Sequence, residues 1–263
     1  MLKKILAAAL IALTAKYAAG SCAGNYLAVY PRAMHISSNP AFLIDFSEKD
    51  FRLRNEISQI IFTAVSAKGR HIKLFPLSVN FSGTMGQVFL KAGGGLQRGD
   101  TVSIIISHVN GDSLGGMTKN FAARVARCQW VVAFKPDRKA PRWVSDSIGY
   151  SFNDMRSSSE PGYSIRFNPC VTDNSRVSNN YRIQGKVVLP LFYEVTLANE
   201  KFICMSEAGS SPSMDYSICG SDFSFGADTL YTAAVRPVDS SGNFGRIEKR
   251  FIFSIPEDSG GQR

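Results

Sequence analysis

The side chains best suited to chemistry in this chain of 263 residues are three histidines and five cysteines. His35, His71 and His108 stand apart from one another and from the cysteines, so they form no recognisable metal-binding or catalytic spacing. The acidic residues are equally dispersed and offer no evident pair for glycoside hydrolysis. We therefore expect no catalytic, cofactor-binding or metal site, and we expect each histidine to have a structural role.

Four of the cysteines suit disulfides better than zinc, because they lack Cys-x-x-Cys spacing and a nearby histidine. Cys204 and Cys219 flank a loop rich in Gly, Ser and Pro. A link that closes this loop of roughly 15 residues would stabilise the fold by about 3 kcal/mol in the chain-entropy model. Cys128 and Cys170 would then pair by elimination, although Cys128 could equally be a buried thiol.

Two further motifs have both a functional and a structural interpretation. Gly93-Gly94-Gly95 lacks the Lys-Ser/Thr and the helix pattern of a phosphate-binding loop, and it leads into a strand instead. Asp239, Asn243 and Asp112 carry oxygens of the type that calcium takes as ligands. Turn formation explains the same three residues, since Asp and Asn bond local backbone and Gly accepts a positive φ. We prefer the turn interpretation and leave calcium binding open.

The N-terminus predicts export. Two lysines precede nine apolar residues, 5–13, and a segment of small residues then ends at Cys22. Residues 1–21 thus read as a secretory signal peptide, whose apolar run is too short to span a hydrocarbon core of ~30 Å. Ala19-Gly20-Ser21 before Cys22 resembles the lipobox of bacterial lipoproteins, in which the cysteine is acylated. The same residues suit ordinary signal peptidase, so a lipid anchor on Cys22 and a free secreted protein both stay open.

The charge of the mature chain is moderately basic. Without the three lysines of the signal peptide, 30 − 3 = 27 basic residues stand against 21 acidic ones, an excess of 6. These charges are scattered along the sequence and form no basic stripe with interleaved aromatic residues, which argues against nucleic acid as a partner. A weak preference for an acidic polysaccharide or an anionic envelope surface remains compatible with this charge.

Alternating apolar residues at 231–235, a turn at 239–243 and a second alternating run at 247–255 predict a β-hairpin. A similar order occurs upstream, where a strand pattern at 102–106 is followed by a Gly/Asp turn and a strand pattern at 128–134. Two copies in one chain predict two tandem domains of one kind.

The remaining strand patterns are short and regularly spaced, which is typical of β-sandwiches rather than α/β proteins. Residues 22–39 are expected to be an irregular lead-in, and the charged segment 135–141 with its two prolines is the expected linker. Further strands are predicted at 57–65, 72–79, 87–90, 143–152, 163–167, 187–197 and 201–204.

A resemblance supports this architecture. Asn39-Pro40 with Ile44-Asp45-Phe46-Ser47-Glu48, and later Leu96-Gln97-Arg98-Gly99-Asp100-Thr101-Val102 before a Gly/Asp turn, resemble the bacterial Ig-like (fibronectin III-like) domains of exported cell-surface proteins. The resemblance implies an all-β fold of two tandem immunoglobulin-like β-sandwich domains, 22–134 and 135–256, after the signal peptide, with a flexible tail at 257–263. Tyr231 fits the tyrosine-corner position of such folds, whereas Val102 stands where their tyrosine is usual.

The function expected from this resemblance is a non-enzymatic exported binding, adhesion or envelope-structural protein. It would act at the outer membrane or cell surface, in the periplasm or outside the cell, on a protein or polysaccharide of the envelope or exterior. Membrane attachment is expected only through a lipid on Cys22, with no cofactor. The alternatives are a periplasmic chaperone of PapD-like architecture and a secreted hydrolase on a β-sandwich scaffold. Because fold-level analogy is a weak warrant for function, all three are carried forward.

Overall fold

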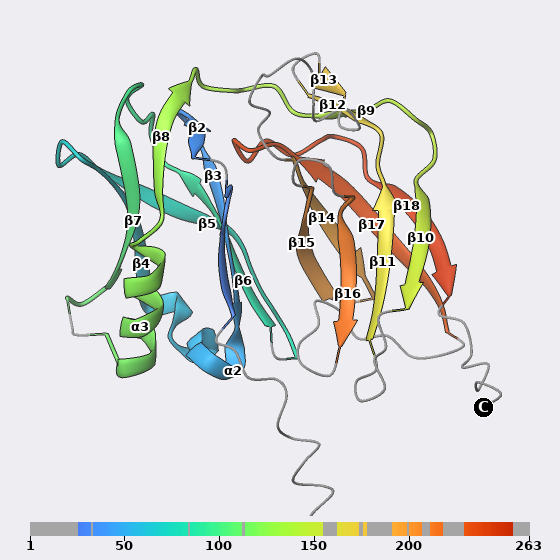
Figure 1. Cartoon of the computed structure of the whole chain (residues 1–263), viewed down its shortest axis with the longest axis horizontal. Helices are drawn as coiled ribbons and strands as arrows, with labels where there is room; N and C mark the ends of the chain where they lie inside the picture. The colour runs from blue at the N-terminus through green and yellow to red at the C-terminus, as the bar shows by residue number, and fades with distance from the viewer. Residues whose placement is uncertain are drawn as a thin grey trace, which may run out of the picture.

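The computed structural model (Figure 1) describes residues 26–32, 34–83, 85–111, 114–154, 162–173, 176–177, 191–198, 200–206, 211–217 and 229–254. The predicted signal peptide at 1–21, Cys22, Cys219 and the predicted tail at 257–263 lie outside these residues. Strands dominate the described chain, which confirms the all-β prediction in its general form. No helix in the described part is long and apolar enough to cross a membrane.

One eight-stranded sheet forms the N-terminal unit, in the order β1-β3-β6-β5-β4-β7-β8-β2. Neighbouring strands are antiparallel except β2 and β8, which are parallel. The strands are β1 (Leu27–Tyr30), β2 (His35–Ser37), β3 (Ala41–Ser47), β4 (Ile60–Ser66), β5 (His71–Ser82), β6 (Met85–Ala92), β7 (Thr101–His108) and β8 (Gln129–Phe134).

Alternation places the core of this unit on one face of the sheet. In β4 the side chains of Ile60, Phe62 and Ala64 are buried, while those between them are half-exposed. The sheet curves so that its two halves meet, and Phe42 of β3 packs against Trp130 of β8 with ring centroids 4.8 Å apart. This alternation is the period of two that is typical of a strand with one buried face.

Helices, which were not predicted from the sequence, cover the part of this core that the sheet leaves exposed. They are α2 (Glu48–Phe51), the 3-10 helices at Leu53–Asn55 and Ile57–Gln59, and α3 (Gly116–Val125) between β7 and β8. Phe121 and Val125 of α3 are fully buried and lie four residues apart, which is helical spacing. β7 and β8 pair antiparallel, as β17 and β18 do, but α3 lies in the connection where the sequence pattern indicated only a Gly/Asp turn.

Two facing sheets and a small third one form the C-terminal unit. The sheet β15-β14-β17-β18 packs against β10-β11-β16, and the core between them includes Phe167 of β11, Tyr193 of β14 and Phe253 of β18. The third sheet has the order β13-β12-β9. The strands are β9 (Arg142–Trp143), β10 (Gly149–Asp154), β11 (Gly162–Asn168), β12 (Val171–Asp173), β13 (Arg176–Val177), β14 (Leu191–Leu197), β15 (Glu200–Ser206), β16 (Ser213–Ser217), β17 (Leu230–Val238) and β18 (Lys249–Ser254).

The predicted hairpin is present as β17 and β18, which pair antiparallel from Leu230 to Val235. Two predictions about strands were wrong. The lead-in at 22–39 contains β1 and β2, because short segments gain pairing partners far along the chain: β2 pairs with β8. The single strand expected at 143–152 is divided into β9 and β10, which belong to different sheets.

The two units pack directly against each other (Figure 1). Phe89 of β6 is fully buried against Phe192 of β14, with ring centroids 5.3 Å apart, and Ile203 of β15 belongs to the same cluster. This cluster covers the outer face of the large sheet at β1, β3 and β6. The sequence predicted only a short linker at 135–141 between the units, and this contact was not predicted.

Candidate functional site

The turn after β17, residues 239–243, lies buried between the two units. Asp239 Oδ1 accepts hydrogen bonds from the backbone N–H groups of Ser241 and Asn243, both at 2.8 Å. The Ala41 N–H in the N-terminal unit donates to the Ser240 carbonyl at 2.8 Å. Asp239 and Ser241 have no exposed surface. The local turn chemistry predicted from the sequence is therefore confirmed, but it serves a buried junction rather than a hairpin end in solvent.

Asn39 joins this turn to the segment between the units. Its side-chain amide donates to the Asp137 carbonyl at 2.5 Å, and its Oδ1 accepts from the Asp137 N–H at 2.8 Å. The same Oδ1 accepts from the Ser241 hydroxyl at 3.1 Å, and the Asn243 amide donates to the Asp137 carbonyl at 3.1 Å. Three segments from distant parts of the sequence are thus fixed by one network of hydrogen bonds, and the charged linker is part of it.

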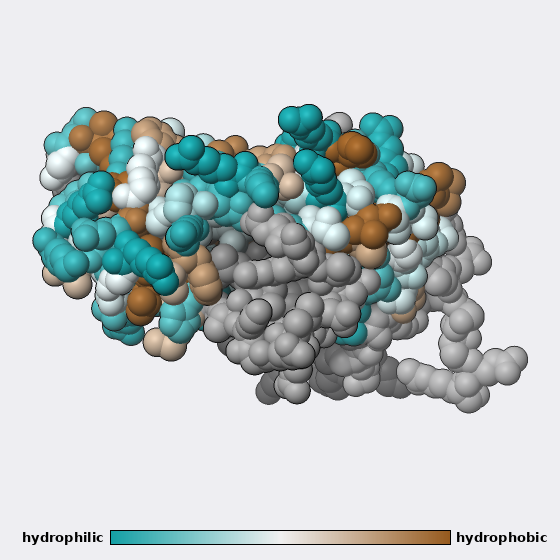
Figure 2. Space-filling view, turned by 90° about the horizontal axis from the view of Figure 1, so that it is seen from above, coloured by the Kyte–Doolittle hydropathy of each residue, from teal (hydrophilic) through white to brown (hydrophobic). Residues whose placement is uncertain are grey.

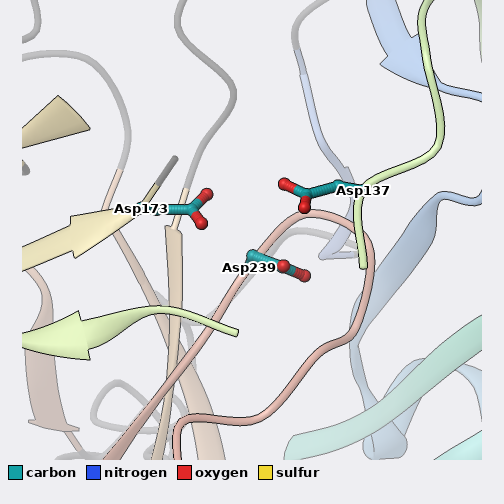
Figure 3. A group of neighbouring side chains, drawn as sticks. All are labelled: Asp137, Asp173 and Asp239. Atoms are coloured by element: carbon teal, nitrogen blue, oxygen red, sulfur yellow. The ribbon is translucent and has the colours of Figure 1, made fainter. Parts of the chain in front are cut away.

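Three carboxylates gather at this junction (Figure 3). Asp137 comes from the linker, Asp173 from the end of β12 and Asp239 from the turn, and their oxygens lie within 4.8 Å of one another. The pKa of Asp239 is raised to about 6, mainly by burial and to a smaller extent by the negative charge of Asp137, while the hydrogen bonds from Asn243 and Ser241 act in the opposite direction. Asp239 is consequently an acid that protonates only a little below neutral pH.

Carboxylate oxygens at this spacing are the ligand type that Ca²⁺ takes. Both lone pairs of Asp239 Oδ1 are already used by backbone N–H groups, and Asp239 Oδ2 accepts from the Asn243 amide at 2.7 Å. These bonds favour the turn-forming interpretation that we preferred from the sequence. Asp112, which we had considered with Asp239 and Asn243, lies outside the described residues.

A second buried polar group lies where β6 meets β15. The side-chain amide of Gln87 donates to the Ile203 carbonyl at 3.1 Å, and its Oε1 accepts from the Ile203 N–H at 2.8 Å. Ile203 lies on an edge strand, so Gln87 occupies the backbone groups that a further strand would otherwise use. Beside it, burial raises the pKa of Asp45 to about 7, opposed by hydrogen bonds from Tyr26 and Gln87.

The histidines do not come together in the structure. His35 lies in β2, His71 begins β5 and His108 ends β7, where its Nε2 lies 2.8 Å from Gln59 Oε1. Among the described residues, the potential metal ligands that gather in a group of three are Asp137, Asp173 and Asp239, with no histidine or cysteine among them.

The cysteine predictions have mixed outcomes. Cys128 and Cys170 are free, half-buried thiols, so the expected Cys128–Cys170 disulfide is not formed in this structure. Cys128 instead packs against the N-terminal core, where burial raises its pKa, which is the buried-thiol alternative. Cys204 is buried in β15. Its expected partner Cys219 lies outside the described residues, as does the lipid-anchor candidate Cys22, so both of these predictions stand as predictions.

One sequence pattern that is typical of serine hydrolases was not recognised from the sequence. Gly111-Asp112-Ser113-Leu114-Gly115 has the form Gly-x-Ser-x-Gly and lies between strand β7 and helix α3. Asp112 and Ser113 themselves lie outside the described residues. Their neighbours have structural roles: Gly111 has a φ of 73° in the turn after β7, and Gly115 precedes α3 as its N-cap. The sheet also differs from that of an α/β-hydrolase, because β7 is antiparallel to both β4 and β8.

Comparisons with known proteins give limited information. No protein-family model and no curated protein matches the chain. Similar solved structures include the Yersinia pseudotuberculosis adhesin InvE, at 12% identity over 89% of this chain and 60% of that one, with a TM-score of 0.22. They also include the S-layer protein rSbsC(31-844), at 9% identity over 87% of this chain and 40% of that one, with a TM-score of 0.21.

A pullulanase from Anoxybacillus sp. LM18-11, complexed with maltotriose, is similar at 7% identity over 86% of this chain and 25% of that one, with a TM-score of 0.24. The chain spans less than two thirds of the length of each of these structures. Likenesses with TM-scores of this size do not establish a shared fold, and no functional conclusion rests on them.

Proposed function

We propose that this protein is a non-enzymatic, exported binding or envelope-structural protein, built of two Ig-like β-sandwich units that act as one rigid body. The observation that carries the proposal is the junction between the units, where an apolar cluster and a buried hydrogen-bond network lie side by side. A junction of this kind holds two surfaces at a fixed angle, which suits a molecule that presents binding faces to a large partner.

The use of the polar residues supports the same proposal. Side-chain oxygens at the junction accept hydrogen bonds from backbone N–H groups, and these oxygens belong to Asn39, Asp137 and Asp239. Turn and linker geometry thus explains two of the three clustered aspartates, Asp137 and Asp239. Export rests on the signal peptide and remains a proposal that the N-terminus of the mature protein tests.

The test is retention of a partner without turnover. Mature protein, residues 22–263, is immobilised and incubated with soluble protein, membrane and insoluble glycan fractions of a bacterial envelope. We expect one glycan or folded surface protein to be retained and eluted chemically unchanged. Retention of unfolded clients that are released on folding would instead support the chaperone.

Hydrolysis is tested in parallel with p-nitrophenyl esters and with reducing-sugar release from the retained glycan. Ser113→Ala is the matched variant for this assay, since it removes the hydroxyl of the Gly-x-Ser-x-Gly pattern. Turnover by the native chain that disappears in Ser113→Ala would refute the non-enzymatic assignment. Mass spectrometry of the exported protein should find the mature chain starting at or near Cys22, and an intact Met1 would refute export through this signal.

A further inference from the structure

The large sheet of the N-terminal unit has an outer face that is covered on one half and open on the other. The C-terminal unit covers β1, β3 and β6 through Phe89 and its neighbours. The outward positions of the other half, β5-β4-β7-β8, are exposed or half-exposed. These outward residues, which we call the open face, are Ile61, Thr63, Val65, His71, Lys73, Phe75, Thr101, Ser103, Ile105, Ser107, Gln129 and Val131.

The charge of the open face has one sign. Lys73 is the charged residue among its twelve positions, and none of them is acidic. Lys68 and Arg70 in the turn between β4 and β5, and Arg98 in the turn before β7, add exposed positive charge at one end of the same strands. The carboxylate at this end, Asp100, is buried and pairs with Lys68 Nζ at 2.8 Å. The remaining cations therefore create a positive potential over the face.

An aromatic ring is held within this positive surface. Phe75 is 48% exposed, and Lys73 Nζ lies 5.3 Å from its ring centroid. The ring lies over Gly93, where an added Cβ would come within 2.2 Å of it. Its position on the face therefore depends on the absence of a side chain at residue 93, and Gly93 has a structural use that the sequence motif did not reveal.

The rest of the open face combines the hydroxyl groups of serines and threonines with aliphatic side chains, the His71 ring and the Gln129 amide. Thr63 lies opposite both Lys73 on β5 and Ile105 on β7, and Ser107 lies opposite Ile61. In Figure 2 the visible described surface of the N-terminal unit is mainly hydrophilic, with hydrophobic residues in separate patches. Sugar rings present hydroxyl groups at their edges and C–H groups on their faces, so a surface that combines hydroxyl groups, aliphatic side chains and one exposed aromatic ring complements them.

We propose that the open face binds an anionic polysaccharide, with Lys73 and the turn cations contacting its acidic groups and Phe75 packing on a sugar ring. This inference rests on the proposed binding function and names its surface and the chemistry of its partner. Charge complementarity identifies the occupant: a second copy of this chain is also basic, whereas an acidic glycan carries the opposite charge at regular intervals along a chain that can follow the strands.

The experiment measures binding of the full mature protein to polygalacturonate, with neutral dextran as the uncharged comparison, by calorimetry at low and physiological salt. We expect binding to polygalacturonate alone, and weaker binding as the salt concentration rises because exposed charges are screened. Lys73→Gln should weaken binding about fivefold, the size of one exposed charge contact. Arg246→Gln removes an equal charge from an exposed residue of the C-terminal unit and should leave the affinity unchanged.

Gly93→Ala supplies a second variant that changes no charge. It should displace the Phe75 ring and weaken binding, and Phe75→Ala should weaken it by a similar factor. Unchanged melting temperatures of both variants establish that the sheet remains folded. If Gly93→Ala unfolds the protein, Lys73→Gln and Phe75→Ala decide the result.

Four outcomes would overturn the inference. Equal affinity for dextran would remove the role of charge, and equal effects of Lys73→Gln and Arg246→Gln would remove the role of this face. Binding to vesicles with anionic lipid headgroups, but not to polygalacturonate, would assign the face to a membrane. If polygalacturonate binding fails while an envelope partner is still retained in the fractionation test, this inference is wrong and the proposed function stands. If no fraction is retained at all, the proposed function itself fails.

Discussion

The buried carboxylate of Asp239 should make the stability of the protein depend on pH. Its pKa is about 6 in the folded protein, against 3.8 for an ordinary aspartate. Between these two values the folded state binds more protons than the unfolded state, so the free energy of unfolding falls as the pH rises. The stabilisation is fully present below pH ~4 and is lost as the pH rises through ~6. A difference of about 2 pKa units corresponds to about 3 kcal/mol, at 1.36 kcal/mol per unit.

Asp239→Asn isolates this contribution, because asparagine does not titrate in this range. Its carbonyl oxygen can still accept from the N–H groups of Ser241 and Asn243. The new NH₂ group faces the Asn243 amide that now donates to Asp239 Oδ2 at 2.7 Å, which costs about 1 kcal/mol at every pH. The free energy of unfolding of the native protein, minus that of the variant, should therefore decrease by up to about 3 kcal/mol between pH 4 and pH 7.

The measurement is urea unfolding at constant ionic strength from pH 4 to pH 7.5, followed by far-UV circular dichroism. Asp50→Asn is the matched control, since it removes the same charge from a half-exposed position in α2. The difference between the native protein and this control should change little over the same range. A difference between the native protein and Asp239→Asn that is flat, or that rises with pH, would refute the assignment of a raised pKa to this buried turn.

Two further predictions concern the buried side of β15. Gln87→Ala should lower the free energy of unfolding by about 1–3 kcal/mol, because it leaves the N–H and C=O of Ile203 without their side-chain partner inside the interface. The control variant Gln97→Ala, at an exposed position, should stay within about 0.5 kcal/mol of the native value in urea unfolding. Equal effects of the two variants would show that the Gln87 amide does not stabilise the edge of β15. The predicted disulfide between Cys204 and Cys219 should appear as one linked fragment in non-reducing peptide mapping, and reduction should lower the melting temperature. Reaction of both thiols with iodoacetamide in the oxidised native protein would contradict this pairing.

The sequence by itself determined the features that depend on local periodicity. Alternation of apolar residues located β14, β17 and β18 and the faces of β17 and β18 that are buried, because the period of two is a property of the strand and not of its partners. In β14 both faces are buried, since the N-terminal unit covers Phe192. The residues at 239–243 specified their turn for the same reason, since Asp239 bonds the backbone N–H groups two and four residues ahead of it.

The helix α3 could have been predicted from the sequence but was not. Phe121 and Val125 have helical spacing, yet Gly115 and Gly116 before them favour a turn interpretation. Strands β1 and β2 were a different kind of failure. Each is only three or four residues long, and each is held by a partner that lies elsewhere in the chain, so no local pattern of useful length identifies it.

Only the tertiary structure decided what covers each surface. The turn at 239–243 reads as an exposed hairpin end in the sequence, but it is buried because Asn39 and Asp137 are brought to it from distant segments. The raised pKa of Asp239 follows from that burial and from the charge of Asp137, neither of which its own neighbours in sequence encode. The period of a strand and the hydrogen bonds of a turn depend on neighbouring residues, so they can be predicted from the sequence. Burial, the interaction between charges and the face of a sheet that stays uncovered depend on which distant elements pack together.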